Sequence, residues 1–125
     1  MAVGDAYYSD AAKNVGLDAI GTTFKYLSAH TANPGSTGAN ECAGSTRALV
    51  TYASASGGSK AVTNAPAVAG IAITDAVQFL GLWSATSGGT YGGRIEVTPT
   101  SATGGSTWTY TAASGALDLA QVASA

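Results

Sequence analysis

The sequence predicts a mainly β protein: a single-domain antiparallel β-sandwich or barrel-like fold with a short N-terminal helix. Three observations predict it. Several short segments alternate apolar and polar residues, glycine-rich turns separate them, and threonines and aromatic residues are frequent within them. The length of 125 residues fits one domain. We expect a helix or arm over residues 1–23, a β-sandwich over 24–114 and a C-terminal tail over 115–125.

The best helix candidate runs from about Asp5 to Thr23. Ser9 and Asp10 can cap a helix start, and the residues that follow, Ala11–Lys13, form helices readily. The apolar stripe of this segment is only partial, and Gly21 is a plausible C-terminal stop. We therefore expect one or two helical turns.

The next part of the chain, up to residue 70, alternates between predicted strands and turns. In order, the segments are a strand at Phe24–His30, a loop at Thr31–Thr46 with a turn at Asn33-Pro34-Gly35, a strand at Ala48–Ala53, a turn at Ser54–Ser59, and a weakly patterned edge strand at Lys60–Val68 that Pro66 interrupts.

The strongest apolar signal lies between Ile71 and Ala85. Leu80 and Leu82 lie on one face of the predicted strand, and the other face is also apolar, with Val77, Phe79, Gly81 and Trp83. A strand that is apolar on both faces is typical of a central strand covered on both sides, by a second layer or by a partner. Leu80 and Leu82 are therefore interface candidates.

Two further strands and a tail complete the prediction. Tyr91–Thr98 alternates, Gly104-Gly105 turns the chain, and Thr107–Thr111 places Trp108 and Tyr110 toward the core with threonines outward. The tail carries further apolar residues and can add a last strand or arm. At the two ends of the chain, the interface candidates are Tyr7, Tyr8, Leu117 and Leu119.

The composition favours a protein that packs against neighbours. The chain has 26 Ala, 17 Gly, 16 Thr and 13 Ser, and charged residues make up 10%, against roughly 25% in an average domain. This balance argues against disorder and implies a surface of hydroxyls and small residues, which favours assembly. We expect a homotrimer or other homo-oligomer; the alternative is a stable monomer with a threonine-rich exterior.

Several partner classes are excluded by the sequence. The basic residues are scattered rather than arranged in a stripe, so no nucleic acid is expected. No run of about 18 apolar residues indicates a membrane span, and the first residues do not form a secretion signal. The single cysteine, Cys42, cannot form an internal disulfide, which suits synthesis in a reducing cytoplasm.

We expect no enzyme activity, cofactor or metal. His30, the single histidine, is interpreted as a structural residue that hydrogen-bonds the following turn; a Cys42–His30 pair acting as nucleophile and base is the alternative. No Gly-x-Ser-x-Gly motif occurs, and one cysteine and one histidine cannot form a zinc site. The residues expected to organise the core or turns are His30, Pro34, Gly35, Phe79, Trp83, Trp108 and Tyr110. Alternatively, Trp83, Tyr91, Trp108 and Tyr110 stack on a sugar.

One segment resembles a known family. Tyr26-Leu-Ser-Ala-His-Thr-Ala-Asn-Pro-Gly-Ser-Thr-Gly-Ala-Asn-Glu41 is similar to the Leu-x-x-His-Thr-Ala-x-Pro-Gly-x-Thr-Gly-x-Asn-Glu segment of short phage virion proteins of the tail fibre, minor structural or decoration type. In that family an arginine, an apolar strand and a small-residue turn follow, as do Arg47, Ala48–Tyr52 and Ser54–Ser59 here. Phe79-Leu-Gly-Leu-Trp-Ser-Ala-Thr-Ser-Gly-Gly89 is a second, weaker similarity. Cys42 departs from the family pattern, and the chain from Ile95 onward is not covered.

The resemblance implies a bacteriophage virion protein that is synthesised in the cytoplasm of the host bacterium. Because the chain is short and has no long repetitive shaft, we expect a capsid decoration protein that binds the outside of the assembled head. A tail fibre, tail-tip or adaptor subunit is the alternative, and a glycan-binding module is a more remote one. The implied partners are the major capsid protein or tail proteins.

Overall fold

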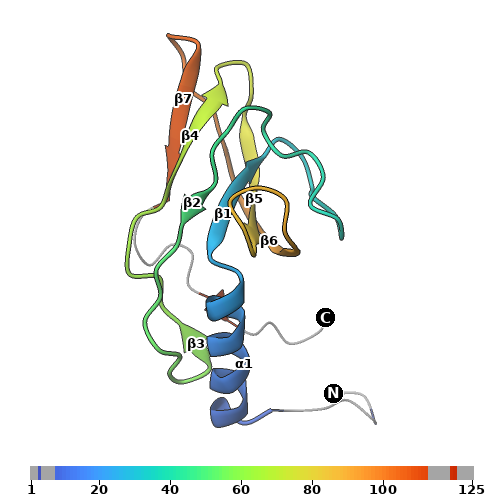
Figure 1. Cartoon of the computed structure of the whole chain (residues 1–125), viewed down its shortest axis with the longest axis vertical. Helices are drawn as coiled ribbons and strands as arrows, with labels where there is room; N and C mark the ends of the chain where they lie inside the picture. Colours follow the sequence, from blue (N-terminus) through green and yellow to red (C-terminus); the bar gives the residue numbers. More distant parts are fainter. Residues whose placement is uncertain (1–2, 4–7, 113–118, 121–125) are drawn as a thin grey trace.

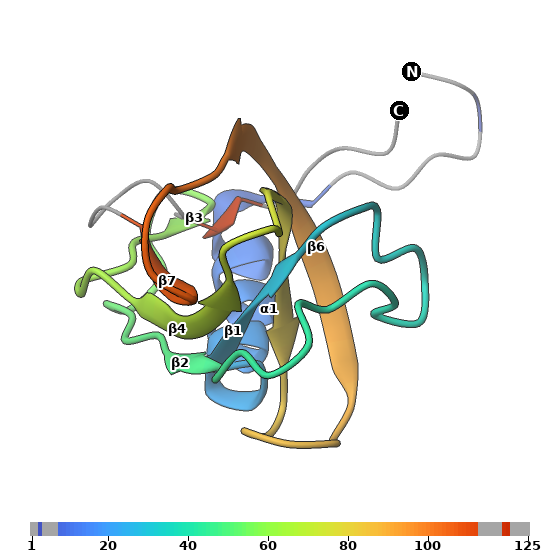
Figure 2. The ribbon, with the colours of Figure 1, turned by 90° about the horizontal axis from the view of Figure 1, so that it is seen from above.

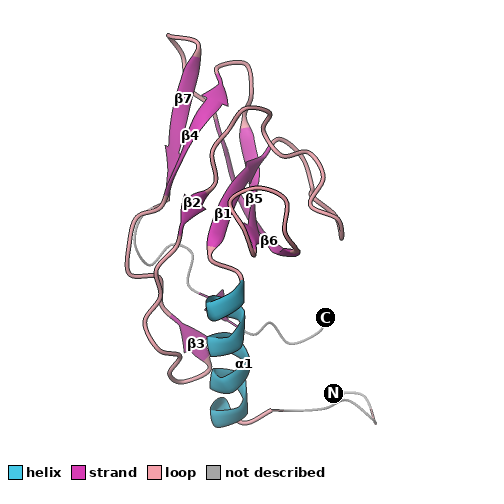
Figure 3. Ribbon diagram, in the orientation of Figure 1, coloured by secondary structure: helices cyan, strands magenta, loops and turns pink. Residues whose placement is uncertain are grey.

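The computed structural model describes residues 3, 8–112 and 119–120, and these form a mainly β fold with one N-terminal helix (Figures 1 and 3). In chain order the elements are α1 (Asp10–Thr23), β1 (Tyr26–His30), β2 (Ala48–Leu49), β3 (Ser59–Lys60), β4 (Ala67–Ala72), β5 (Val77–Trp83), β6 (Tyr91–Thr100), β7 (Thr107–Thr111) and β8 (Leu119–Ala120). The predicted fold class is confirmed, although the sheets do not close into a barrel.

The strands form one four-stranded sheet and two smaller ones, and all their pairings are antiparallel. The large sheet has the order β2-β1-β5-β6, while β4 pairs with β7 and β3 pairs with β8. The core lies between the large sheet and the β4–β7 pair. Leu27 and Leu80 from the first layer and Val68 and Ile71 from the second are all fully buried in one cluster. Burial of these side chains from both layers is the main stabilising contribution to the sandwich.

β5 is the central strand that the sequence predicts, because it lies between β1 and β6. This position corrects the interpretation of Leu80 and Leu82 as interface residues. Leu80 is 0% exposed and Leu82 is 7% exposed, so the chain itself covers both side chains. The alternative that the sequence left open, a second layer rather than a partner, is the one observed.

The strand predictions near the end of the chain are confirmed. In β7, Trp108 and Tyr110 are half-buried against the core, and the threonines between and beside them are exposed. Leu119, predicted as an interface residue, lies in β8 opposite Lys60 and packs half-buried against the core. Tyr7 and Leu117 lie outside the described residues, whereas Tyr8 is exposed.

Helix α1 is longer than the one or two turns expected. Ser9 caps it by accepting a hydrogen bond from the backbone N–H of Ala12, and it continues past Gly21 to Thr23. Gly21 is not a stop signal. It is buried inside the helix, where a Cβ would collide with the side chain of Lys60.

Polar groups attach α1 to the segment around β3. The Asp18 carboxylate accepts hydrogen bonds from the Ala55 N–H at 2.8 Å and from Lys60 Nζ at 2.6 Å, and Asn14 Oδ1 accepts one from the Gly58 N–H at 2.9 Å. The hydrogen bond from Lys60 also lowers the pKa of Asp18. The docking face of the helix therefore combines the buried Leu17 and Gly21 with polar contacts from Asn14 and Asp18, which explains why its apolar stripe is incomplete.

Candidate functional site

The loop between β1 and β2 begins after His30 and includes the Asn33-Pro34-Gly35 turn, and its own hydrogen bonds fix its shape. Asn33 Oδ1 accepts a bond from the Gly35 N–H at 2.8 Å, which forms the predicted turn. The Pro34 carbonyl accepts bonds from the N–H groups of Gly38 and Ala39 at 3.1 and 3.0 Å. Asn40, at a positive φ of 66°, donates from Nδ2 to the Asn33 carbonyl. The tip of the loop is thus closed on itself.

Below this loop, His30 is the centre of a buried chain of hydrogen bonds. Its Nδ1 lies 2.8 Å from the Ala39 carbonyl oxygen, which can only accept, so Nδ1 carries the proton and Nε2 is the acceptor. Ser28 Oγ lies 2.6 Å from Nε2 and donates to it, and Trp83 Nε1 donates to Ser28 Oγ at 2.9 Å. The predicted role of His30, bonding to the following turn, is confirmed.

Ser28 and His30 have the spacing of a nucleophile and its base, but they are sealed. Both residues are 0% exposed. Gly81 lies against the pair, since a Cβ at that position would stand 2.6 Å from Ser28 Oγ and 2.7 Å from His30 Nε2. Burial also lowers the pKa of His30, so the ring is neutral at neutral pH. A substrate has no path to this serine in the described structure.

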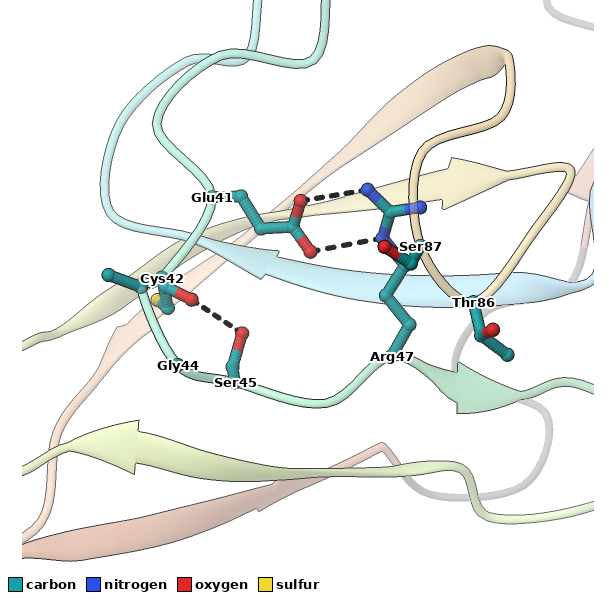
Figure 4. A pocket seen from close by; sticks show the side chains of 8 residues that line it. Glu41, Cys42, Gly44, Ser45, Arg47, Thr86 and Ser87 are labelled. Carbon is teal, nitrogen blue, oxygen red and sulfur yellow. Dashed lines mark hydrogen bonds and ion pairs between the residues drawn. The ribbon is translucent and has the colours of Figure 1, made fainter.

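Arg47 connects the end of the loop to the turn that follows β5. Its Nε and Nη2 donate to the two carboxylate oxygens of Glu41, both at 3.0 Å (Figure 4). Its Nη1 donates to the carbonyls of Ala85 and Gly88 at 2.9 and 2.8 Å. The guanidinium carbon lies 3.8 Å from the centre of the Trp83 ring. Trp83 therefore connects Arg47, which covers its ring, to His30, which it reaches through Ser28.

A surface pocket of about 340 Å³ opens beside this ion pair (Figure 4). It is lined by Glu41, Cys42, Ala43, Gly44, Ser45, Arg47, Thr86 and Ser87. Three polar side chains of the pocket are engaged within the chain: Ser45 Oγ donates to the Cys42 carbonyl, and Glu41 pairs with Arg47. Cys42 is 3% exposed, and burial raises the pKa of its thiol to about 11. The nucleophilic thiolate is therefore scarce at neutral pH, which leaves the Cys42–His30 alternative without an activated nucleophile.

The aromatic residues named as sugar-stacking candidates form two separate pairs. Trp83 and Tyr91 meet edge to face with ring centres 5.3 Å apart in the large sheet, while Trp108 and Tyr110 do so at 6.3 Å in β7. All four rings are half-buried, and Trp83 is further covered by Arg47 and Gly38. They do not form one shared platform for a sugar.

The loop consequently has a buried base and an exposed tip. His30, Pro34, Gly38 and Cys42 are buried. The exposed residues are Ala32, Asn33, Gly35, Ser36, Thr37, Ala39 and Asn40, and none of them is charged. Chemically, this tip can donate and accept hydrogen bonds from amides, hydroxyls and backbone groups. It presents them on a preformed scaffold.

Sequence reasoning identified His30, Pro34 and Gly35 correctly but gave no role to Ser28, and it noted Arg47 only as part of a motif. Ser28 belongs to an ordinary alternating strand, and the carbonyl partners of Arg47 lie 38 and 41 positions away in the sequence. The only local signal for Arg47 was the glutamate six residues before it.

Among residues 3, 8–112 and 119–120, no cluster of three or more histidine, cysteine or acidic side chains could hold a metal ion. No helix within the described part of the chain is long and apolar enough to cross a membrane. Comparison with protein-family models, with curated proteins and with solved structures found no match.

Proposed function

We propose that this chain is a structural protein of a bacteriophage virion, and specifically a decoration protein that binds the outside of the assembled head through the tip of the 31–40 loop. The observation that carries the proposal is that the polar side chains of the motif hold the 31–40 loop in shape. His30, Glu41 and Arg47 bear the chemistry of the segment, and all three are occupied in holding the loop.

A loop held in this way is suited to binding a fixed lattice. Ordering a flexible loop on binding costs free energy, and a loop that is already ordered avoids most of that cost. A ligand that binds only the assembled shell stabilises the shell in proportion to its affinity. The uncharged tip fits hydrogen bonding to a protein surface, and it has no arginine or lysine that would attract phosphate.

The same geometry supports a role other than catalysis. The two candidate nucleophiles, Ser28 and Cys42, are buried at 0% and 3% exposure. The single histidine is committed on both ring nitrogens. A tail fibre, tail-tip or adaptor subunit remains the second candidate, because the resemblance covers both kinds of virion protein.

Cryo-electron microscopy of purified particles of the phage that encodes this chain tests the proposal. We expect density that fits the β-sandwich on the outer surface of the head, with the 31–40 loop facing the shell. Density on the tail instead would replace decoration with the second candidate. Absence of the protein from purified virions would refute both.

A matched pair of variants tests the loop tip itself. Thr37→Arg places a bulky charge at an exposed position of the tip, and Thr103→Arg does the same at an exposed position between β6 and β7. Added to particles that lack the protein, the Thr37→Arg chain should fail to bind, whereas the Thr103→Arg chain should bind like the unmodified protein. Equal binding of both variants would exclude the tip as the contact.

A further inference from the structure

Strand β6 is the longest strand and forms an open edge of the large sheet. Its ten residues, Tyr91–Thr100, pair with β5 on one side, and no other strand of the described structure pairs with its outer side. Figure 2 shows β6 as a long strand beside β5, and in this view the loop that follows β1 extends past β6. An open edge presents a row of unpaired N–H and C=O groups, which can pair with another strand.

The two charged side chains of β6 lie on one face of the sheet, where they would meet the side chains of a paired strand. Arg94 and Glu96 are its only charged residues, and both are exposed. They are two positions apart, so their side chains lie on the same face of the sheet. Their partners on β5 are Gly81 and Phe79. The residue between them, Ile95, is half-buried and packs against the core.

We propose that β6 pairs antiparallel with β6 of a second copy of this chain, across a two-fold axis at Ile95. In this register Ile95 stands opposite the partner's Ile95, Arg94 stands opposite the partner's Glu96, and Glu96 stands opposite the partner's Arg94. The strand is thus complementary in charge to itself. Opposite charges directly across an antiparallel pair stabilise it, and like charges destabilise it.

The charges also select this register over its neighbours. The backbone groups that point away from β5 belong to alternate residues, so registers of self-pairing differ in steps of two. A shift of one step places Arg94 opposite the partner's Arg94. A shift in the other direction places Glu96 opposite the partner's Glu96. The register centred on Ile95 is the one that gives two opposite-charge pairs.

Other features of β6 limit its pairing with a second copy to the middle of the strand. Pro99 has no N–H and would stand opposite the partner's Tyr91. The register against β5 also shifts between Tyr91 and Gly93 and between Glu96 and Thr100, so regular pairing is expected only around Ile95, over residues 94–96. The 31–40 loop approaches this face of the sheet, because Arg94 Nη1 lies 3.4 Å from the Gly35 carbonyl. One pair of strands buries less surface than a stable dimer of standard size. We therefore expect a weak dimer with a Kd between about 1 µM and about 1 mM.

Sedimentation equilibrium of the purified full chain over this concentration range tests the proposal, with charge reversal as the probe. Arg94→Glu alone places the introduced glutamate opposite the partner's Glu96, and Glu96→Arg alone places two arginines opposite each other. Each single variant should dimerise about tenfold more weakly or not at all. The double variant, which exchanges the two charges, should dimerise like the unmodified chain.

A mixture supplies the most specific result. Arg94→Glu chains and Glu96→Arg chains, each weak alone, should form a heterodimer when combined, because every charged pair is then opposite in sign. Lys25→Glu is the matched control, since it makes the same change in net charge at an exposed residue outside β6. It should leave the dimer unchanged.

Three results would overturn the proposal: a chain that stays monomeric up to about 1 mM, a trimer, or single variants that dimerise as well as the unmodified chain. The inference does not depend on the virion role. A failure to find the protein on particles and a failure to dimerise are separate outcomes.

Discussion

Replacing Arg47 with alanine tests whether the loop network stabilises the fold, and we expect the free energy of unfolding to fall by about 3 kcal/mol. The side chain is 7% exposed and that of its partner Glu41 is 27% exposed. Arg47 donates four hydrogen bonds, two of them to the carboxylate, and covers the Trp83 ring. The substitution removes all of these contacts together.

The magnitude follows from the burial of the pair. Removing one partner of a fully buried ion pair costs about 3–5 kcal/mol, because an unpaired charge stays behind, whereas exposed pairs are worth about 0.2–1 kcal/mol. Arg47 is close to the buried limit. Glu41 can regain some water once its partner is gone, which places the expected loss at the lower end of the buried range.

Arg47→Lys separates charge from geometry. Lysine keeps the positive charge, but its single ammonium cannot bind both Glu41 oxygens and the carbonyls of Ala85 and Gly88 at once. We expect a loss of about 2 kcal/mol, smaller than that of the alanine variant because one strong bond to Glu41 can re-form. A lysine variant as stable as the unmodified protein would show that only charge matters at this position.

Urea unfolding followed by far-ultraviolet circular dichroism measures these differences. The double variant Arg47→Ala/Glu41→Gln completes a double-mutant cycle and isolates the pair. If the network holds the loop, the double variant should lose less than the sum of the two single losses. A loss below about 1 kcal/mol for Arg47→Ala would place the pair among ordinary surface ion pairs and refute the reasoning.

Four further predictions follow from the same region and the core. Burial lowers the pKa of His30 below its ordinary 6.5, so the unfolded chain binds the proton more readily than the folded chain. The contribution of His30 to stability should be complete above about pH 6.5 and should fall as the pH drops toward the folded-state pKa. In urea unfolding measured at several pH values, His30→Gln should remove this pH dependence. Gly38→Ala should cost about 2 kcal/mol or more by thermal unfolding, because φ is +77° and a Cβ would stand 2.5 Å from the Trp83 ring; Gly35→Ala, at φ +64° with open space around it, should cost only about 1 kcal/mol. Cys42 should react with a thiol reagent only after unfolding, and fast labelling of the native protein would contradict its burial. Cys42→Ala should be tolerated better than Cys42→Ser, because the serine variant buries a hydroxyl. Trp108→Ala should destabilise the protein by about 3–5 kcal/mol. Trp108→Phe should cost far less, because the buried indole N–H has no hydrogen-bond partner among the described residues. Equal losses for the two variants in urea unfolding would contradict this difference.

Strands β1, β5, β6 and β7 could be predicted because alternation of apolar and polar residues follows burial directly. The predicted strands at Ala48–Ala53 and Lys60–Val68 were wrong in their bounds, because strand pairing covers only Ala48–Leu49 and Ser59–Lys60 there and β4 begins at Ala67. In β7, Trp108 and Tyr110 alternate with threonines, and the structure buries and exposes them accordingly. In β5, apolar residues on both faces indicated a central strand, and β1 and β6 flank it. The sequence could not decide whether a second layer or a partner covers Leu80 and Leu82, because both would require the same residues.

The predicted length of α1 was too short, because few of its docking contacts are apolar and periodic. Leu17 is the only large apolar side chain that the helix buries, and the other docking contacts are made by Asn14 and Asp18, whose partners lie 37 to 44 positions away. Polar docking leaves no periodic apolar signal. Gly21 looked like a stop signal, yet it is small because the side chain of Lys60 lies against it. Such contacts between distant parts of the chain cannot be inferred from local propensity.

Two ion pairs bear on the argument from composition. The chain has only five basic and seven acidic residues, and two of each are used in the Arg47–Glu41 and Lys60–Asp18 pairs. The outward face of α1 follows the same trend, with exposed Val15 and Ile20 among small residues. A soluble domain usually relies on surface charge to prevent association, and these two pairs use four of the chain's twelve charged residues. Arg94 and Glu96 are among the other charged residues, and both are exposed on β6. Charge reversal at these two positions should therefore change self-association, whereas charge reversal at the exposed Lys25 should not.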